Sequence, residues 1–179
     1  VPAAMLMSNF QAVLRANVKF NHDNITLIDL VKVLNTSVIQ SAKGERFISF
    51  FVGYYNHSNR ILKYINAGHN YPLVINDGNV KELCVGCTAL GIFDPLPKIE
   101  SKTITLKPNT IIVCFTDGLV EAENDSGEQF QSERLANYLK EYSYLNMREM
   151  NKALFEEIDK FRNNTAYPDD TALLSIRFI

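Results

Sequence analysis

The feature of the sequence that most constrains the fold is an apolar run that ends at an acidic turn. Residues 111–115 (Ile-Ile-Val-Cys-Phe) are apolar at every position, which is typical of a strand buried on both faces. The run ends at Thr116-Asp117-Gly118, where the glycine permits a sharp turn or a close approach of a ligand. A carboxylate at the end of a buried strand is costly unless a cation pairs with it. Asp117 is therefore either an ordinary turn residue or a ligand of a cation.

A pair of acidic residues lies far along the chain from Asp117. Asp169 and Asp170 follow Pro168 and precede residues 172–179, which we expect to form a terminal strand. Carboxylate oxygens are the ligands that hard divalent cations prefer. Two strand ends that both carry carboxylates indicate a candidate cation site, provided that the fold brings them together.

The remaining pattern predicts an α+β fold in a single domain, residues 1–179. Apolar residues recur at helical spacing in four segments, and β-branched and aromatic residues cluster in short segments separated by turns. Strands joined by tight turns pair antiparallel, and helices confined to the flanks of the strand region favour α+β over a doubly wound fold. We expect four helices: residues 2–19, ended by Asn21–Asn24; a second from Thr26, ended by residues 41–44; a third from about Ser132 to Tyr142; and a fourth from Asn146 to Phe161. We expect strands over residues 47–55, 60–66, 72–75, 80–83, 102–106, 111–115 and 172–179.

Composition and charge exclude several classes of function. Hydrophobic residues make up 46% and charged residues 21% of the chain, as in ordinary globular domains. A net charge of −2 without a block of like charges indicates no nucleic-acid partner. No apolar run approaches the roughly 20 residues that span a bilayer, and no signal-peptide pattern is visible. We therefore expect a cytoplasmic protein without a membrane segment.

Three cysteines fit a reducing cytoplasm better than a disulfide framework. Cys84 and Cys87 have the spacing of a zinc or redox pair. One pair supplies only half of a tetrahedral zinc site, and no βαβ pattern places it at a helix start. A small zinc or redox module stays open as an alternative, beside cysteines in a loop without such a role.

Several segments, taken together and in order, resemble a known family. They are residues 1–7 (Val-Pro-Ala-Ala-Met-Leu-Met), 64–73, 89–91, 115–122, 124–135 and 169–170. The resemblance is to the metal-dependent protein phosphatases of the 2C kind, in the bacterial branch typified by stage II sporulation protein E and the stress-response sigma-factor regulators. It implies an α-β-β-α sandwich of two antiparallel sheets flanked by helices.

The resemblance also implies a chemistry. Family members hydrolyse phosphoserine or phosphothreonine with two divalent cations, usually Mn²⁺ or Mg²⁺, that activate a water, so no side-chain nucleophile is expected. Asp117, Asp169 and Asp170 match metal-ligating positions, with Gly118 and His69 as candidates for support or phosphate contact. The family places a threonine two residues after the second aspartate. Here Ala172 takes that place and Thr171 precedes it, so which of the two aspartates faces the metal stays open.

The resemblance has one large departure. Family members carry a Gly-Asp-aromatic motif and an Asp-x-x-Gly-His-Gly turn before the residues that match Val1–Ala4, and neither is in this sequence. We therefore expect residues 1–179 to be the C-terminal major part of a truncated domain, which holds one cation or none and is inactive alone. The alternative is a non-catalytic pseudophosphatase or scaffold that binds a signalling partner.

The resemblance implies regulatory partners. They are a phosphorylated regulatory protein, such as an anti-sigma-factor antagonist, and an upstream sensor or response-regulator domain. A homodimer through the first two helices is a further hypothesis.

Other residues have a structural and a functional interpretation. His69 is either a loop-ordering residue or a general acid. Glu121 and Glu123 either line a metal site or favour the first turn of a helix after Gly118. Arg134 either contacts phosphate or pairs on a helix surface. Met5, Met7 and the segment 47–55 are expected in the core.

Overall fold

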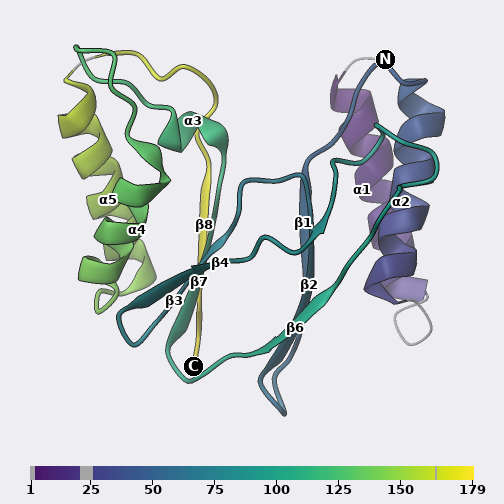
Figure 1. The fold of residues 1–179 in the computed structure, drawn as a ribbon, viewed down its shortest axis with the longest axis horizontal. Helices are drawn as coiled ribbons and strands as arrows, with labels where there is room; N and C mark the ends of the chain where they lie inside the picture. Colours follow the sequence, from purple (N-terminus) through teal and green to yellow (C-terminus); the bar gives the residue numbers. More distant parts are fainter. Residues whose placement is uncertain (1–2, 21–25, 164) are drawn as a thin grey trace. The chain divides into compact units, whose positions relative to one another are not determined.

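Two four-stranded sheets and five helices make up the described part of the chain, which is residues 3–20, 26–163 and 165–179 of a computed structural model (Figure 1). This architecture confirms the α+β prediction. The chain forms two compact units: a first unit of Val1–His69 with Cys84–Thr105, and a second unit of Asn70–Leu83 with Leu106–Ile179. The prediction of a single domain stays a prediction. Across the described residues, no helix combines the length and the apolarity that crossing a membrane requires.

The first unit combines a helical pair with one sheet. Helices α1 (Ala3–Phe20) and α2 (Leu27–Ala42) precede strands β1 (Phe50–Asn56), β2 (Ile61–Ala67), β5 (Gly86–Cys87) and β6 (Lys102–Thr105). Strand β2 pairs antiparallel with β1 and β6. Thr26 caps α2, because its hydroxyl accepts a hydrogen bond from the Asp29 N–H at 3.1 Å. The predicted helix start at Thr26 is therefore confirmed, whereas Pro2 and Asn21–Asn24 lie outside the described residues.

Strand β5 was not expected, because residues 84–97 have a loop-like sequence. Gly86 lies against β2 in parallel register, opposite Asn66, and the Asn66 N–H donates to the Val85 carbonyl at 3.0 Å. A Cβ on Gly86 would lie 1.8 Å from the Asn66 carbonyl oxygen. Only glycine permits this approach of two backbones, so the residue that suggested a loop is the one that lets the segment join the sheet.

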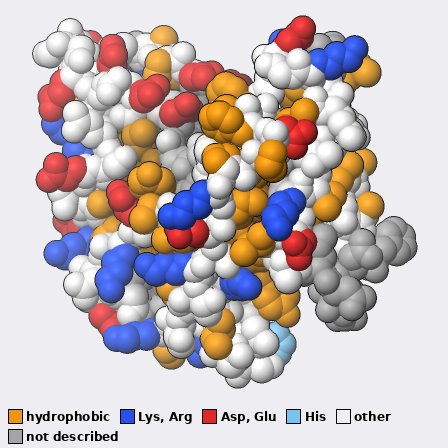
Figure 2. Space-filling view, turned by 45° about the vertical axis from the view of Figure 1, so that its right-hand side comes forward, with side chains coloured by type: hydrophobic (Ala, Val, Ile, Leu, Met, Phe, Trp, Pro, Cys, Tyr) orange, Lys and Arg blue, Asp and Glu red, His pale blue; other side chains and the backbone are white. Residues whose placement is uncertain are grey.

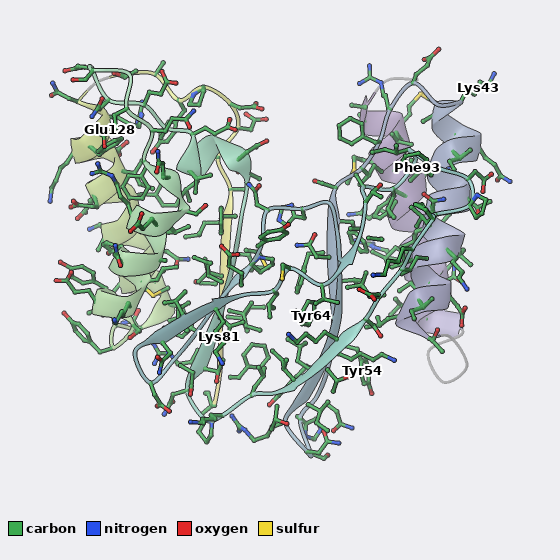
Figure 3. All side chains as sticks on the ribbon, in the orientation of Figure 1. Lys43, Tyr54, Tyr64, Lys81, Phe93 and Glu128 are labelled. Atoms are coloured by element: carbon green, nitrogen blue, oxygen red, sulfur yellow. The ribbon has the colours of Figure 1, made fainter. Side chains whose placement is uncertain are left out.

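The core of the first unit lies between its helices and its sheet. Leu6 and Phe10 of α1 pack with buried residues of α2 and β2, Leu30, Val31, Leu34, Val38 and Ile65 among them. The expectation that Met5 and Met7 are core residues is wrong: their side chains are 64% and 49% exposed. They flank Leu6 in the helix, so the face that buries Leu6 turns them outward. Phe47 and Tyr54, also expected in the core, are exposed as well, Tyr54 on β1 as labelled in Figure 3.

The second unit is built on an antiparallel sheet in the order β4-β3-β7-β8. The strands are β3 (Leu73–Asn76), β4 (Asn79–Glu82), β7 (Thr110–Phe115) and β8 (Leu173–Phe178), and the helices are α3 (Asp117–Val120), α4 (Gln131–Tyr142) and α5 (Met147–Arg162). Strand β7 is buried at five of its six positions, which confirms the prediction made from its apolar run. The Asn146 side chain caps α5 by accepting from the Glu149 N–H at 3.0 Å.

The turn at residues 107–109 does not make a hairpin. Strand β6 before it pairs with β2 in the first unit, and β7 after it pairs with β3 and β8 in the second. Both edges of β7 are therefore occupied, which leaves no place beside it for β6. Leu119, Leu135, Met150, Leu154 and Ile158 bury the helices of the second unit against Val113 and Phe115 of this strand.

Candidate functional site

The pairing of β7 with β8 brings the two acidic segments together at one end of the second unit. Phe115 lies opposite Leu173 in the last ladder pair. Directly beyond it, the Thr116 N–H donates to the Ala172 carbonyl at 3.1 Å, and the Ala172 N–H donates to the Thr116 hydroxyl at 2.8 Å. Residues 56 to 58 positions apart in the sequence thus become neighbours.

Gly118 lets the two segments approach more closely than any other residue would. A Cβ at this position would lie 2.8 Å from the carbonyl oxygen of Asp170 and 2.9 Å from that of Asp169. These are backbone atoms, so they cannot move aside as a flexible side chain could. The start of α3, which carries Asp117, therefore lies directly against the backbone of Asp169 and Asp170.

The three aspartates, which we name the candidate cation site, have exposed side chains. One oxygen of Asp117 accepts from the Gly118 N–H at 3.0 Å, and one oxygen of Asp169 accepts from the Asp170 N–H at 2.7 Å. Among the described residues, the second oxygen of Asp117 and that of Asp169 accept no hydrogen bond, so both can face a ligand. These bonds explain how the carboxylates are oriented, because each is tied to the residue that follows it.

Within the part of the chain that the structure describes, no salt bridge joins Asp117, Asp169 or Asp170 to a lysine or arginine. The described residues also contain no group of three or more His, Cys, Asp or Glu side chains arranged to hold a metal ion. Carboxylates are nevertheless the donors that Mg²⁺ and Mn²⁺ prefer, and their exposure leaves room for the waters that such ions keep. The donors fit a divalent cation, and further ligands would have to complete its shell.

Acidic side chains are frequent at this end of the second unit, at the upper left of Figure 2. The loop of residues 124–128 contributes to them, with Glu128 labelled in Figure 3. The Asn124 side chain orders the loop by accepting from the Ser126 and Glu128 N–H groups, both at 3.0 Å. Glu128 forms an ion pair with Arg134, whose guanidinium also lies 4.8 Å from the centre of the Phe161 ring. Arg134 therefore pairs on the surface of α4, as the structural interpretation predicts.

Of the two interpretations of Glu121 and Glu123, the one that places them in the first turn of a helix is wrong, whereas a role at the rim of a metal site stays a prediction. Helix α3 ends at Val120, so Glu121 caps its C-terminus and Glu123 pairs with Gln129 in an isolated bridge. The helix is short because the chain turns back: the Phe130 N–H donates to the carbonyl of the buried Ala122 at 2.8 Å. Neither glutamate lies in the first turn of a helix.

His69 belongs to the first unit, whereas the three aspartates belong to the second. Its N–H donates to the Asn66 side-chain oxygen at 2.8 Å, and its carbonyl accepts from the Asn66 side-chain amide at 3.0 Å. These bonds order the turn that contains His69. A role in catalysis or phosphate contact stays a prediction.

The two cysteines of the alternative zinc or redox module have free thiols. Cys84 is exposed, and Cys87 lies half-buried in β5, where burial raises the pKa of its thiol. A raised pKa leaves less thiolate, which is the form that binds zinc and reacts with disulfides. The chemistry of these cysteines therefore gives the zinc or redox alternative no support.

One residue of the site had no role in the sequence-based prediction. The Thr116 hydroxyl donates to the Asp170 carbonyl at 3.1 Å and accepts from the Ala172 N–H, so it joins the two acidic segments. A hydroxyl directly before Asp-Gly at the end of a buried strand was the available signal. Its partner could not be inferred, because it lies 54 residues away.

Comparisons with known proteins agree with this architecture. The SiaA-PP2C domain of Pseudomonas aeruginosa matches all of the chain at a TM-score of 0.85 and 18% identity, and the chain covers 71% of that structure. The PP2C phosphatase domain of SpoIIE from Bacillus subtilis, with a fragment of its regulatory domain, matches 98% of the chain at a TM-score of 0.73 and 15% identity, over 49% of that structure. These likenesses establish the fold of PP2C-like phosphatase domains.

Sequence comparison gives a consistent result. Protein IcfG of Synechocystis is 29% identical over 94 residues, which is 52% of this chain and 15% of that protein. The chain therefore matches a small part of this relative. The model of the family described as stage II sporulation protein E (SpoIIE) matches residues 1–179. The chain belongs to the SpoIIE family.

Proposed function

We propose that this chain is part of a metal-dependent protein serine/threonine phosphatase domain and that Asp117, Asp169 and Asp170 are cation ligands in it. The observation that carries the proposal is the contact of Gly118 with the backbone of Asp169 and Asp170. This contact holds the acidic residues of two distant segments at one end of a sheet.

The identity of the cation is proposed from chemistry and from solved structures of similar fold. Among these structures are RsbX in complex with magnesium, at 16% identity and a TM-score of 0.64, and the SpoIIE phosphatase domain of Bacillus subtilis presoaked with Mn. We propose Mn²⁺ or Mg²⁺. Such cations supply a water of lowered pKa and neutralise charge that builds on phosphoryl oxygens.

The residues of this chain have separate parts in the proposed site. Asp117 and Asp169 supply negative charge and oxygen donors, and Asp170 supplies a further carboxylate. Thr116 holds the two segments in register, and Gly118 permits their contact. Three carboxylates are few for two divalent cations, so we expect weak cation binding and little hydrolysis unless other carboxylates complete the site.

The proposed substrate is a phosphoserine or phosphothreonine of a bacterial regulatory protein. The support is the family and the similarity to RsbU and RsbW domains of Rv1364c from Mycobacterium tuberculosis, at a TM-score of 0.74 and 21% identity. A second candidate is a non-catalytic scaffold of the same fold. It is favoured by the lack, among the described residues, of a cluster of three metal-ligating side chains.

Titration with MnCl₂, followed by the electron paramagnetic resonance signal of free Mn²⁺, tests the proposal. We expect Asp117→Asn and Asp169→Asn each to weaken binding at least tenfold, because each removes a charged ligand. Asp77→Asn is the matched control, since Asp77 is an exposed aspartate of the same unit that pairs with Lys107 at 3.1 Å.

Mn²⁺-dependent release of p-nitrophenol from its phosphate ester then separates the two candidates. A phosphatase loses this activity in Asp117→Asn and keeps it in Asp77→Asn. Mn²⁺ binding that is equal in all four proteins would remove Asp117 and Asp169 from any cation site. If the other carboxylates that complete the cation site are present, Mn²⁺ binding without hydrolysis of the phosphate ester would favour the scaffold.

A further inference from the structure

The segment that leads from α5 to Asp169 is tied to the end of that helix. Asn163 follows α5 with a left-handed φ of 46° and donates its N–H to the Asp159 carbonyl at 3.2 Å. The Thr165 N–H then donates to the Arg162 carbonyl at 3.0 Å. Backbone bonds thus hold Asn163 and Thr165 to the end of the helix.

The Arg162 side chain extends this attachment toward the acidic pair. Its Nη1 lies 2.7 Å from an Asp159 carboxylate oxygen, its Nη2 donates to the Thr165 carbonyl, and its guanidinium lies 3.6 Å from the centre of the Tyr167 ring. The Tyr167 hydroxyl donates to the same Asp159 oxygen at 3.1 Å. We name Asp159, Arg162 and Tyr167 the Arg162 clamp.

The clamp is not an ordinary surface ion pair. The Arg162 side chain is only 12% exposed, whereas Lys160, in the same turn of α5, is 75% exposed and pairs with Glu157 at 3.9 Å. Exposed pairs of that kind contribute little to stability. Among the described side chains, the buried Nε of Arg162 has no hydrogen-bond partner. Burying a guanidinium with one unbonded N–H is costly, so its other contacts must offset that cost.

Two further contacts hold the same segment. Asp125, in the loop after α3, accepts hydrogen bonds from the Asn163 side chain and from the Thr165 hydroxyl, the latter at 3.2 Å. On the other side of the acidic pair, Thr116 bonds the Asp170 carbonyl and the Ala172 N–H. Tyr167 is two residues before Asp169, and the intervening Pro168 has a restricted φ. The position of Asp169 is therefore fixed from both sides.

We propose that Arg162 is a positioning residue of the cation site: by stacking on Tyr167 it fixes the start of the 168–171 segment so that Asp169 lies beside Asp117. This inference rests on the proposed function, because it assigns Arg162 a role through a cation ligand. Arginine suits the role, since its planar group stacks on a ring while donating to a carboxylate and a carbonyl. Lysine offers one charge centre and no planar face.

The test compares Arg162→Ala, Arg162→Lys and Tyr167→Phe with the matched control Lys160→Ala, which removes one positive charge from the same turn of α5. In MnCl₂ titrations we expect about tenfold weaker binding in Arg162→Ala and an intermediate loss in Arg162→Lys. Tyr167→Phe keeps the stacked ring and should bind within about threefold of the parent. Lys160→Ala should match the parent.

A second readout does not depend on a metal. Amide hydrogen exchange, measured by NMR without Mn²⁺, should accelerate at least tenfold at Ala172 in Arg162→Ala, because the 168–171 segment is released. The amide of Val113, in the centre of the sheet, should exchange at the parent rate.

The outcomes separate the two proposals. Equal Mn²⁺ affinity of Arg162→Ala and Lys160→Ala would overturn the positioning role, and so would unchanged exchange at Ala172 or equal acceleration at Ala172 and Val113. A parent protein whose Mn²⁺ binding does not depend on Asp117 and Asp169 would overturn the proposed function instead. In that case faster exchange at Ala172 would still identify the clamp as an anchor of the segment.

Discussion

The turn after β2 and the turn after β7 are built alike, and they differ in what their polar side chains bond. In both, a glycine lies against the backbone of a distant segment: a Cβ on Gly68 would lie 2.7 Å from the Ala89 nitrogen, and one on Gly118 would lie 2.8 Å from the Asp170 oxygen. In the first turn, the buried Asn66 uses both ends of its amide on His69. In the second, Asp117 is exposed, and only one of its oxygens accepts a hydrogen bond from the residues that the structure describes.

This difference separates a structural turn from a candidate site. A buried amide that bonds the next turn of backbone stabilises the fold and leaves nothing for a ligand. Exposed carboxylates contribute little to the fold and cost less to keep charged. Both glycines lie against the backbone of a distant segment. Only the second turn offers an exposed carboxylate to a ligand.

The largest expected effect comes from exchanging Asn and Asp between the two turns. Asn66→Asp replaces a buried donor by a charge facing the His69 carbonyl, so we expect the free energy of unfolding to fall by about 3 kcal/mol. The loss should shrink at acid pH, where a protonated carboxyl can donate again. Asp117→Asn should change stability by less than about 0.5 kcal/mol. Urea denaturation measures both free energies of unfolding, and similar losses in the two variants would contradict the difference between the two turns.

The next effect comes from adding a methyl group to Gly118. Gly118→Ala places a Cβ against two carbonyl oxygens, so we expect a loss of about 1–3 kcal/mol together with weaker Mn²⁺ binding, because the acidic segments are forced apart. Gly68 lies against Ala89 and, unlike Gly118, has a left-handed φ of 68°. Gly68→Ala should therefore lose comparable stability, but the protein should keep its Mn²⁺ affinity. Thermal melting with and without MnCl₂ distinguishes the two. Gly118→Ala with parental stability would contradict the contact.

The smallest of these effects belongs to the hydroxyl that joins the acidic segments. Thr116→Val keeps the shape of the side chain but removes the bonds to the Asp170 carbonyl and the Ala172 N–H. We expect a loss of about 1 kcal/mol, measured by urea denaturation, and a several-fold loss of Mn²⁺ affinity. Thr116→Ser, which retains the hydroxyl, should recover most of both. If Val and Ser behave alike, the hydroxyl does not hold the segments in register.

Local signals in the sequence were sufficient for much of the fold. The apolar run at 111–115 predicted the central strand, and Thr26 and Asn146 predicted helix starts that the structure confirms. These features depend on residues within a few positions of one another. Strand β5 could not be predicted in this way, because it forms only where Gly86 meets Asn66. Met5 and Met7 were expected in the core because they are apolar, although helical spacing from Leu6 and Phe10 turns both of them outward.

The candidate site was predictable only in part. Asp117, Asp169 and Asp170 stand out because two strand ends both carry carboxylates, the donors that hard cations prefer, and their segments do lie together. The sequence-based prediction missed the roles of Thr116, which joins the acidic segments, and of Arg162, which we propose as a positioning residue. Arg162 is near the end of an amphipathic helix, where a basic residue is expected from the helix dipole alone. Its stacking on Tyr167 depends on how the chain turns after the helix.

The most direct test of the central claim is whether one cation contacts both acidic segments. Substoichiometric Mn²⁺ broadens the NMR signals of nearby amides through its unpaired electrons. We expect the amide signals of residues 116–118 and 169–171 to broaden together as Mn²⁺ is added, and Asp169→Asn to abolish the broadening at both segments. Broadening of one segment without the other, or of neither, would contradict a shared site.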